Sequence, residues 1–225
     1  AGIVASIASG VMGSYVVVRR ITYLAGGVAH CTLGGIGVAE YLRQVYGMSW
    51  LHPLYGAAVA AIGAALLIGW VSLRAKQRED TVISALWAVG MAIGVLFLAR
   101  TPGYQTDPMN YLFGNILLVS TRELYILTAL DVVVLVVGLA FYNRFLAVCF
   151  DGEFAELRGV SVQFYFLLLL ALTALTVVVL VTVVGLIMVI ALLTLPVAIA
   201  GHFVHRLWHI MIVATLISML LTTGG

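Results

Sequence analysis

Long apolar stretches separated by short polar breaks run through all 225 residues of this chain. A helix needs about 20 apolar residues to cross the hydrocarbon core of a bilayer. The pattern therefore predicts eight membrane-spanning helices, at about 1–18, 21–46, 54–73, 81–99, 124–142, 161–181, 184–204 and 208–222. The apolar run from Val162 to Ala200 is about twice a crossing, so we expect it to turn back at Gly185.

The composition agrees with a chain whose solvent is lipid. Hydrophobic residues make up 64% of it and charged residues 9%, whereas soluble domains carry roughly 25% charged residues. We expect an all-α integral membrane protein, a polytopic bundle of about eight transmembrane helices in one domain spanning 1–225. Because the chain has no initiator Met and ends just after an apolar run, we expect it to be truncated.

The remaining composition excludes several classes of protein. A net charge of +2 is too small to indicate a nucleic-acid partner. Cys31 and Cys149 lie in apolar stretches, without the spacing of a zinc finger or a disulfide framework. The only lysine, Lys76, is not part of a P-loop, so ATP must be hydrolysed by a partner if it drives transport. No nucleophile–base pair or H-E-x-x-H motif indicates an enzyme.

The basic residues predict the orientation in the membrane. Eight of them fall in alternate connections, against three in the opposite ones: Arg19, Arg20, Arg74, Lys76, Arg78, Arg144, Arg158 and Arg206 against Arg43, Arg100 and Arg122. The positive-inside rule makes the first set cytoplasmic, as expected in a bacterial inner membrane. It predicts that 74–80, 143–160 and 205–207 are cytoplasmic, and that 47–53, 101–123 and the Gly185 corner lie outside.

The segment 150–159, between the fifth and sixth predicted crossings, has the pattern of a short amphipathic helix. Asp151 is a suitable N-cap, and Gly159 is a suitable end. Phe150, Phe154 and Leu157 recur at i, i+4 and i+7 and form one apolar face. The polar side chains are Asp151, Glu153, Glu156 and Arg158. The pattern fits a helix resting on lipid headgroups, although its acids suit an anionic leaflet poorly, or one docking into a cytoplasmic partner.

One histidine lies at membrane depth on a stripe of glycines. Gly26, His30, Gly34 and Gly37 fall within roughly 80° of one another around a helix. We expect room beside the imidazole for water or an ion, and a polar group at this depth is a functional candidate. The alternative is a hydrogen bond to a neighbouring helix. One histidine is not a complete metal site, since zinc takes three or four protein ligands.

Other ionisable residues rank below His30. Asp131 is about two turns into its helix from the outer side, within reach of the interface. Glu40 is near the outer end of its helix and can pair with Arg43 at i+3. Three histidines share a helical face but are expected in an exposed cytoplasmic loop: His202, His205 and His209.

Six motifs in the same order resemble those of the permeases of bacterial zinc/manganese/iron ABC importers. They are Gly13–Arg20 (GSYVVVRR), His30, Tyr111–Leu117 (YLFGNIL), Asp151–Gly159 (DGEFAELRG), Leu172–Val177 (LTALTV) and Ala191–Pro196 (ALLTLP). The resemblance covers essentially the whole chain. Two departures are that the family usually has aspartate where Gly26 stands here, and that it continues past Gly225 with another apolar segment.

The resemblance implies a subunit that is not itself an enzyme and has no permanent cofactor. It implies two permeases side by side, two cytoplasmic ATPase subunits and an extracytoplasmic metal-binding protein. Segment 151–159 would be the coupling helix and His30 would face the translocation path, with Asp131 and Glu40 as weaker metal candidates. Without the aspartate, the site favours zinc over manganese or iron, because imidazole suits zinc and carboxylate suits manganese.

A secondary transporter driven by an ion gradient is the alternative function. It would need inverted repeats and paired intramembrane acids or broken helices. The sequence shows no clear repeat, and Asp131 is its one deep acid.

Overall fold

The computed structural model describes residues 2–48, 50–75, 79–102 and 120–224. Within these ranges the fold is helical, without strands, as lipid requires of a bundle whose backbone hydrogen bonds must be satisfied internally. The helices are α1 (Gly2–Val18), α2 (Tyr23–Tyr46), α3 (Pro53–Ala75), α4 (Glu79–Arg100), α6 (Thr121–Ala140), α7 (Tyr142–Phe150), α8 (Gly152–Leu157), α9 (Val162–Val184), α10 (Leu186–Phe203) and α11 (Leu207–Gly224).

The chain is a multi-pass membrane protein, and all eight predicted segments are helical. Five of the described helices are long and apolar enough to cross a bilayer, namely α3, α4, α9, α10 and α11. A sixth crossing is added if α6 and α7, which are bent by 71° at their junction, count as one. Helix α1 is apolar but has only 17 residues, and α2 is not among the helices that are both long and apolar enough to cross. The number of eight crossings therefore stays a prediction.

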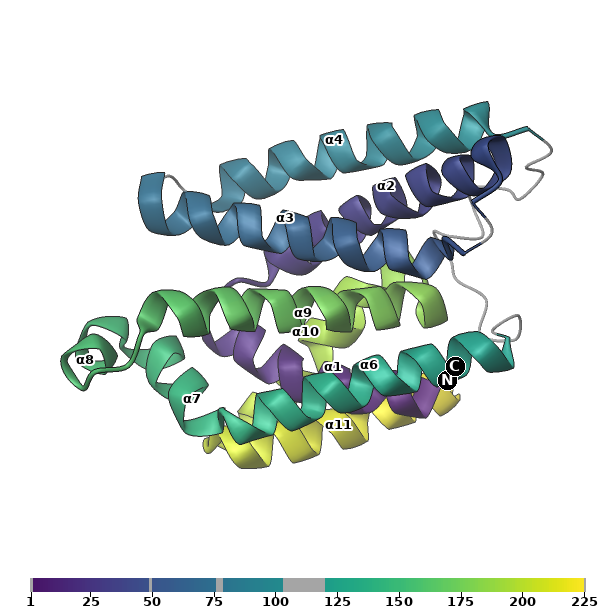
Figure 1. The fold of residues 1–225 in the computed structure, drawn as a ribbon. Coiled ribbons are helices and arrows are strands. Elements are labelled where there is room, and N and C mark those ends of the chain that lie inside the picture. Colours follow the sequence, from purple (N-terminus) through teal and green to yellow (C-terminus); the bar gives the residue numbers. More distant parts are fainter. Residues whose placement is uncertain (1, 49, 76–78, 103–119, 225) are drawn as a thin grey trace.

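The helices form two groups that meet at α9 and α10 (Figure 1). One group is α2 with α3 and α4, and the other is α1 with α6, α7 and α11. Both α9 and α10 contact α1 on one side and α2 on the other. The short helix α8 lies at one end of the bundle, and both termini lie at the opposite end.

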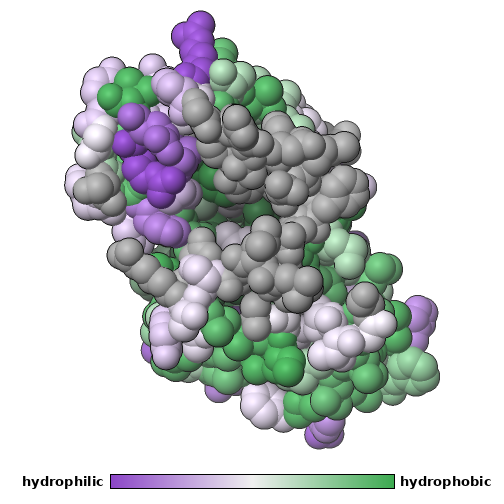
Figure 2. All heavy atoms as spheres, turned by 90° about the vertical axis from the view of Figure 1, so that its right-hand side faces the viewer, coloured by the Kyte–Doolittle hydropathy of each residue, from purple (hydrophilic) through white to green (hydrophobic). Residues whose placement is uncertain are grey.

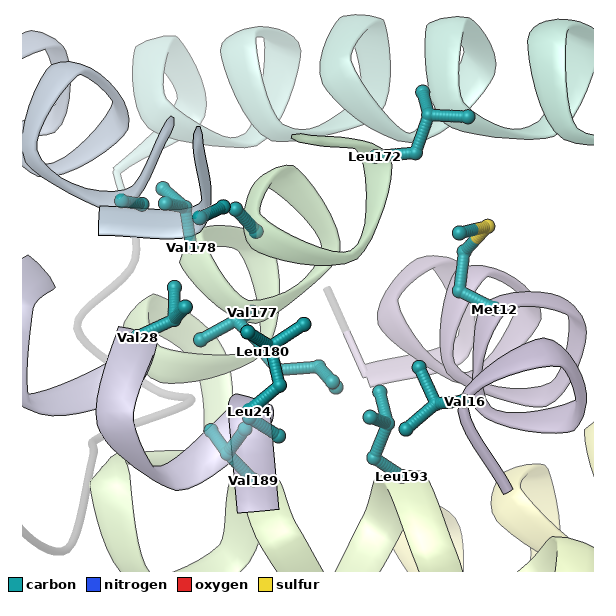
Figure 3. Packing of buried hydrophobic residues seen from close by; sticks show 14 of the residues in the cluster. Met12, Val16, Leu24, Val28, Leu172, Val177, Val178, Leu180, Val189 and Leu193 are labelled. Carbon is teal, nitrogen blue, oxygen red and sulfur yellow. The ribbon is translucent and has the colours of Figure 1, made fainter. Parts of the chain in front are cut away.

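The hydrophobic core lies where α1, α2, α9 and α10 meet. Figure 3 shows side chains of all four helices pointing toward one another in this region. Those labelled are Met12, Val16, Leu24, Val28, Leu172, Val177, Val178, Leu180, Val189 and Leu193. Many large hydrophobic side chains are also exposed on the outside of the described bundle. Seen from the end opposite α8, hydrophobic and hydrophilic residues both appear at the surface (Figure 2).

Glycines bring α2 into backbone contact with both α3 and α4. A Cβ atom added to Gly35 would lie 2.2 Å from the carbonyl oxygen of Gly56 on α3. One added to Gly34 would lie 2.9 Å from the carbonyl oxygen of Gly90 on α4. Such close approach is how helices associate in lipid, where the hydrophobic effect gives no driving force.

The segment 143–160 contains two helices, where the sequence indicated one. Helix α7 packs Phe145, which is fully buried, against Tyr15 and Tyr165. Phe145, Val148 and Cys149 recur at helical spacing and are all buried, which explains why a helix forms here. Phe150 therefore ends α7 and does not belong to the same helix as Phe154 and Leu157.

We expect the end of the bundle that carries α8 to be cytoplasmic. In an otherwise unchanged chain, His205→Cys should react with an impermeant thiol reagent only after cells are permeabilised, whereas Val45→Cys should react in intact cells. Both native cysteines, Cys31 and Cys149, are buried, so background labelling should be low. Labelling of His205→Cys from outside intact cells would contradict the orientation.

Candidate functional site

His30 is held by its own helix. Its Nδ1 atom lies 2.8 Å from the backbone carbonyl oxygen of Gly26, one turn earlier on α2. A carbonyl oxygen only accepts, so Nδ1 carries a proton, and in the neutral imidazole the lone pair is therefore on Nε2. The side chain is half-buried. The hydrogen bond thus favours the neutral tautomer that can bind a metal ion through Nε2.

The room expected on the glycine stripe beside His30 is filled by α4. The indole of Trp87 stacks on the imidazole, with ring centroids 4.3 Å apart and planes 27° apart. Further along the stripe, Gly34 and Gly37 meet the backbone of Gly90 and Gly94. The prediction of open space is therefore wrong along this stripe, because the small residues serve close helix packing.

Glu40 forms the local ion pair expected from its spacing. Its Oε1 accepts hydrogen bonds from Arg43 at 2.7 Å and from Gln44 at 3.1 Å. The side chain is buried and the partners are on the same helix. Its carboxylate is therefore already engaged by a cation of its own helix.

Asp131 is buried, so the expectation that it can reach the interface is wrong. The residue is 3% exposed, and no group of the described residues forms a hydrogen bond with its Oδ1. It lies beside the backbone of Ala8, because α6 packs against α1 and α9. A lone acid at this depth is costly, which makes it a functional candidate.

The structure does not bring the predicted metal residues together. His30 and Glu40 are ten residues apart on α2, which is about 15 Å along a helix, and Asp131 is on α6. Across the described ranges, no three His, Cys, Asp or Glu side chains form a group that could hold a metal ion. As expected, three histidines at the α10–α11 connection are exposed: His202, His205 and His209.

Helix α8 is capped at both ends as its sequence predicts. The Asp151 side chain accepts a hydrogen bond of 3.0 Å from the Phe154 backbone N–H. After the helix, Gly159 has φ +77°, its N–H donates to Glu156, and the Val160 N–H donates to Ala155. This double hydrogen bond is the Schellman motif, which favours glycine at the left-handed position. The two caps therefore define the ends of this helix of only six residues.

The polar and apolar side chains of α8 largely face away from the rest of the chain. Ala155 is buried, whereas Phe154 is 51% exposed and Leu157 is 87% exposed. Its acidic residues Glu153 and Glu156 are exposed too. We call these four exposed residues the α8 surface: Glu153, Phe154, Glu156 and Leu157.

An aromatic cluster joins α7, the neighbour of α8, to the bundle. The guanidinium of Arg144 lies over the rings of Phe141 and Tyr165, at 5.6 and 5.2 Å, and donates a hydrogen bond to the Tyr165 hydroxyl. Tyr15 donates to the backbone carbonyl of Gly138 at 3.0 Å. The cluster links the α8 end to α1, α6 and α9.

The whole chain, residues 1–225, matches the model of the ABC 3 transport family. The chain belongs to this family. The resemblance seen in its motifs is thereby confirmed, although the Tyr111–Leu117 motif lies outside the described residues. Members of the family are membrane permeases, not enzymes.

Relatives and a solved structure agree with this assignment. A "probable metal transport system membrane protein" of Chlamydia pneumoniae is 43% identical over 221 residues, which cover 98% of this chain and 75% of the relative. The "manganese transport system membrane protein MntC" of Listeria monocytogenes is 32% identical over 209 residues, covering 93% and 72%. The structure "PsaBC from Streptococcus pneumoniae in complex with Fab" matches with a TM-score of 0.82 and 26% identity, covering 97% and 76%.

Sequence reasoning missed Trp87 as a neighbour of His30. In the sequence Trp87 is one aromatic residue in an apolar run, with no motif around it. Its stacking depends on the relative rotation of α2 and α4, which no local pattern reports.

Proposed function

We propose that this chain is the permease of an ATP-driven importer that carries a divalent transition-metal ion into the cytoplasm. It would work with a cytoplasmic ATPase, an extracytoplasmic metal-binding protein and a second copy of itself. The α8 surface carries this proposal: a rigidly capped helix at one end of the bundle, with Phe154 and Leu157 exposed. A chain without a P-loop around its one lysine needs such a contact to use ATP.

The α8 surface fits a protein groove better than a lipid headgroup layer. Glu153 and Glu156 would face an anionic cytoplasmic leaflet unfavourably. An exposed aromatic and an exposed leucine on one short helix are instead the anchors that a helix inserts into a groove. Asp151 and Gly159 hold these anchors in a fixed geometry by capping α8. We therefore assign coupling to Asp151, Glu153, Phe154, Leu157 and Gly159.

A displacement of α8 can be transmitted to the membrane helices through close packing. Asp151, in an extended conformation, is the single residue between α7 and α8. Phe145 of α7 is fully buried against Tyr15 of α1 and Tyr165 of α9. Because α1 and α9 contain much of the core, movement of the ATPase subunits can change the packing around the translocation path.

The metal would meet His30 on this path. Through Nε2 it would supply an imidazole ligand, which suits zinc, although the named relatives include manganese systems. Asp131 is a second candidate ligand, since its Oδ1 has no hydrogen-bond partner in the part of the chain that the structure describes. Glu40 is a weaker one, since Arg43 already pairs with it. A site with few ligands suits a path, where an ion must also leave.

The energy source is tested in proteoliposomes that contain the permease and its ATPase. With metal-loaded binding protein added on the extracytoplasmic side of the permease, uptake should require ATP. It should persist when ionophores collapse ion gradients. Uptake that stops with ionophores and continues without ATP would instead establish the gradient-driven alternative.

We expect His30→Ala to lower metal uptake by at least about 10- to 100-fold, the cost of losing even an outer-shell partner of a metal ligand. The measurement is uptake of labelled zinc and manganese by cells with equal amounts of permease in the membrane. His205→Ala, which removes an exposed imidazole elsewhere, is the matched control and should transport normally. Equal uptake by the His30 and His205 variants would leave His30 with a packing role only.

A further inference from the structure

The ring of His30 has an aromatic neighbour that no motif assigns. Trp87 of α4 stacks on it with ring centroids 4.3 Å apart. A second constraint comes from α2 itself, where Nδ1 donates a hydrogen bond of 2.8 Å to the Gly26 carbonyl oxygen. These two contacts fix the plane of the imidazole and its rotation about the side-chain bonds.

Trp87 also occupies the space beside residue 26. A Cβ atom added to Gly26 would lie 2.7 Å from Cζ3 of Trp87 and 3.1 Å from Cδ1 of Ile190 on α10. A separation of 2.7 Å is shorter than van der Waals contact between carbon atoms, which is about 3.5–4.0 Å. Any side chain at residue 26 would therefore displace the indole from His30.

We propose that Trp87 is a positioning residue that sets the metal preference of the permease, an inference that rests on the proposed role of His30 in transport. It fixes the plane of the imidazole, and it fills the space that a ligand side chain at residue 26, on the preceding turn of α2, would need. Position 26 is at i−4 from His30, so a side chain there would lie on the same helix face. The site consequently offers an incoming ion an imidazole from α2 without a carboxylate beside it.

The donor chemistry gives this exclusion a consequence for the cargo. Imidazole suits zinc, whereas carboxylate and water suit manganese. A carboxylate admitted at residue 26 should therefore favour manganese, but only when Trp87 has been replaced by a smaller side chain. The two positions should act together, because one occupies the space that the other needs.

The experiment compares the purified permease–ATPase complex as wild type, Gly26→Asp, Trp87→Ala and the double variant. Equilibrium binding of zinc and of manganese is measured for each, along with the amount of intact complex recovered. We expect Trp87→Ala to weaken zinc binding about tenfold, the size typical for residues that orient a metal ligand. Trp87→Phe, which keeps an aromatic ring, should retain most of the wild-type affinity for zinc.

Gly26→Asp alone should reduce recovery of the complex, because its side chain collides with the indole. The double variant should recover, and its ratio of manganese to zinc binding should rise at least about tenfold over wild type. A double-mutant cycle over the four proteins then measures the coupling of the two positions.

Two results would overturn the proposal. One is a Trp87→Ala complex that binds zinc as wild type does. The other is a double variant that assembles no better than Gly26→Asp, or assembles with an unchanged metal ratio. His30→Ala separates this failure from that of the proposed function: if His30→Ala lowers uptake while Trp87→Ala changes nothing, only the role of Trp87 is wrong.

Discussion

Replacing Phe154 with Asp should abolish co-purification of the ATPase and metal uptake together. In the proposed complex this half-exposed ring enters a groove, where an aspartate would be a buried charge without a partner. Phe154→Ala should weaken the complex as well, because truncating such an anchor often costs about 2 kcal/mol or more, roughly a 30-fold loss of affinity. The measurement is the ATPase recovered per permease after purification in detergent.

The control for Phe154 is an exposed phenylalanine outside α8. Phe203, at the end of α10, is 76% exposed, so Phe203→Ala should leave the ATPase bound. Neither Phe154 variant alters a membrane-spanning helix, and both should accumulate in the membrane like wild type. Normal uptake with the ATPase still bound in Phe154→Asp would show that α8 is not the coupling element.

Gly35→Leu should prevent the permease from accumulating in a folded form. Even a Cβ atom at Gly35 would lie 2.2 Å from the Gly56 carbonyl oxygen and 2.6 Å from the Ala60 Cβ. Helices α2 and α3 would have to separate, and overpacking of this kind costs about 1–3 kcal/mol or more. The gain in helix propensity from replacing glycine, about 1 kcal/mol, does not offset this. Thermal unfolding of the purified permease measures the loss for the milder Gly35→Ala.

Gly201 of α10 provides the matched comparison. It is exposed, and an added Cβ would have no neighbour within 4 Å among the described residues. Gly201→Ala should therefore leave the unfolding temperature unchanged or raise it. Equal stability of the Gly35→Ala and Gly201→Ala variants would contradict the close contact between α2 and α3.

Features that depend on neighbouring residues in the chain were predicted from the sequence. The eight apolar segments are helical because the length and composition of each suffice to specify a helix in lipid. The caps of α8 at Asp151 and Gly159 and the Glu40–Arg43 pair are contacts within a few residues, so spacing alone indicates them. Family membership followed from six motifs, each readable along the chain.

Only the tertiary structure decided how those helices are used. The stacking of Trp87 on His30, the burial of Asp131 and the 71° bend between α6 and α7 depend on how each helix is rotated against partners distant in sequence. An apolar helix in lipid has little hydrophobic contrast around its circumference to record that rotation. For this reason the glycines near His30 indicated open space in the sequence, whereas in the fold they bring α4 into contact.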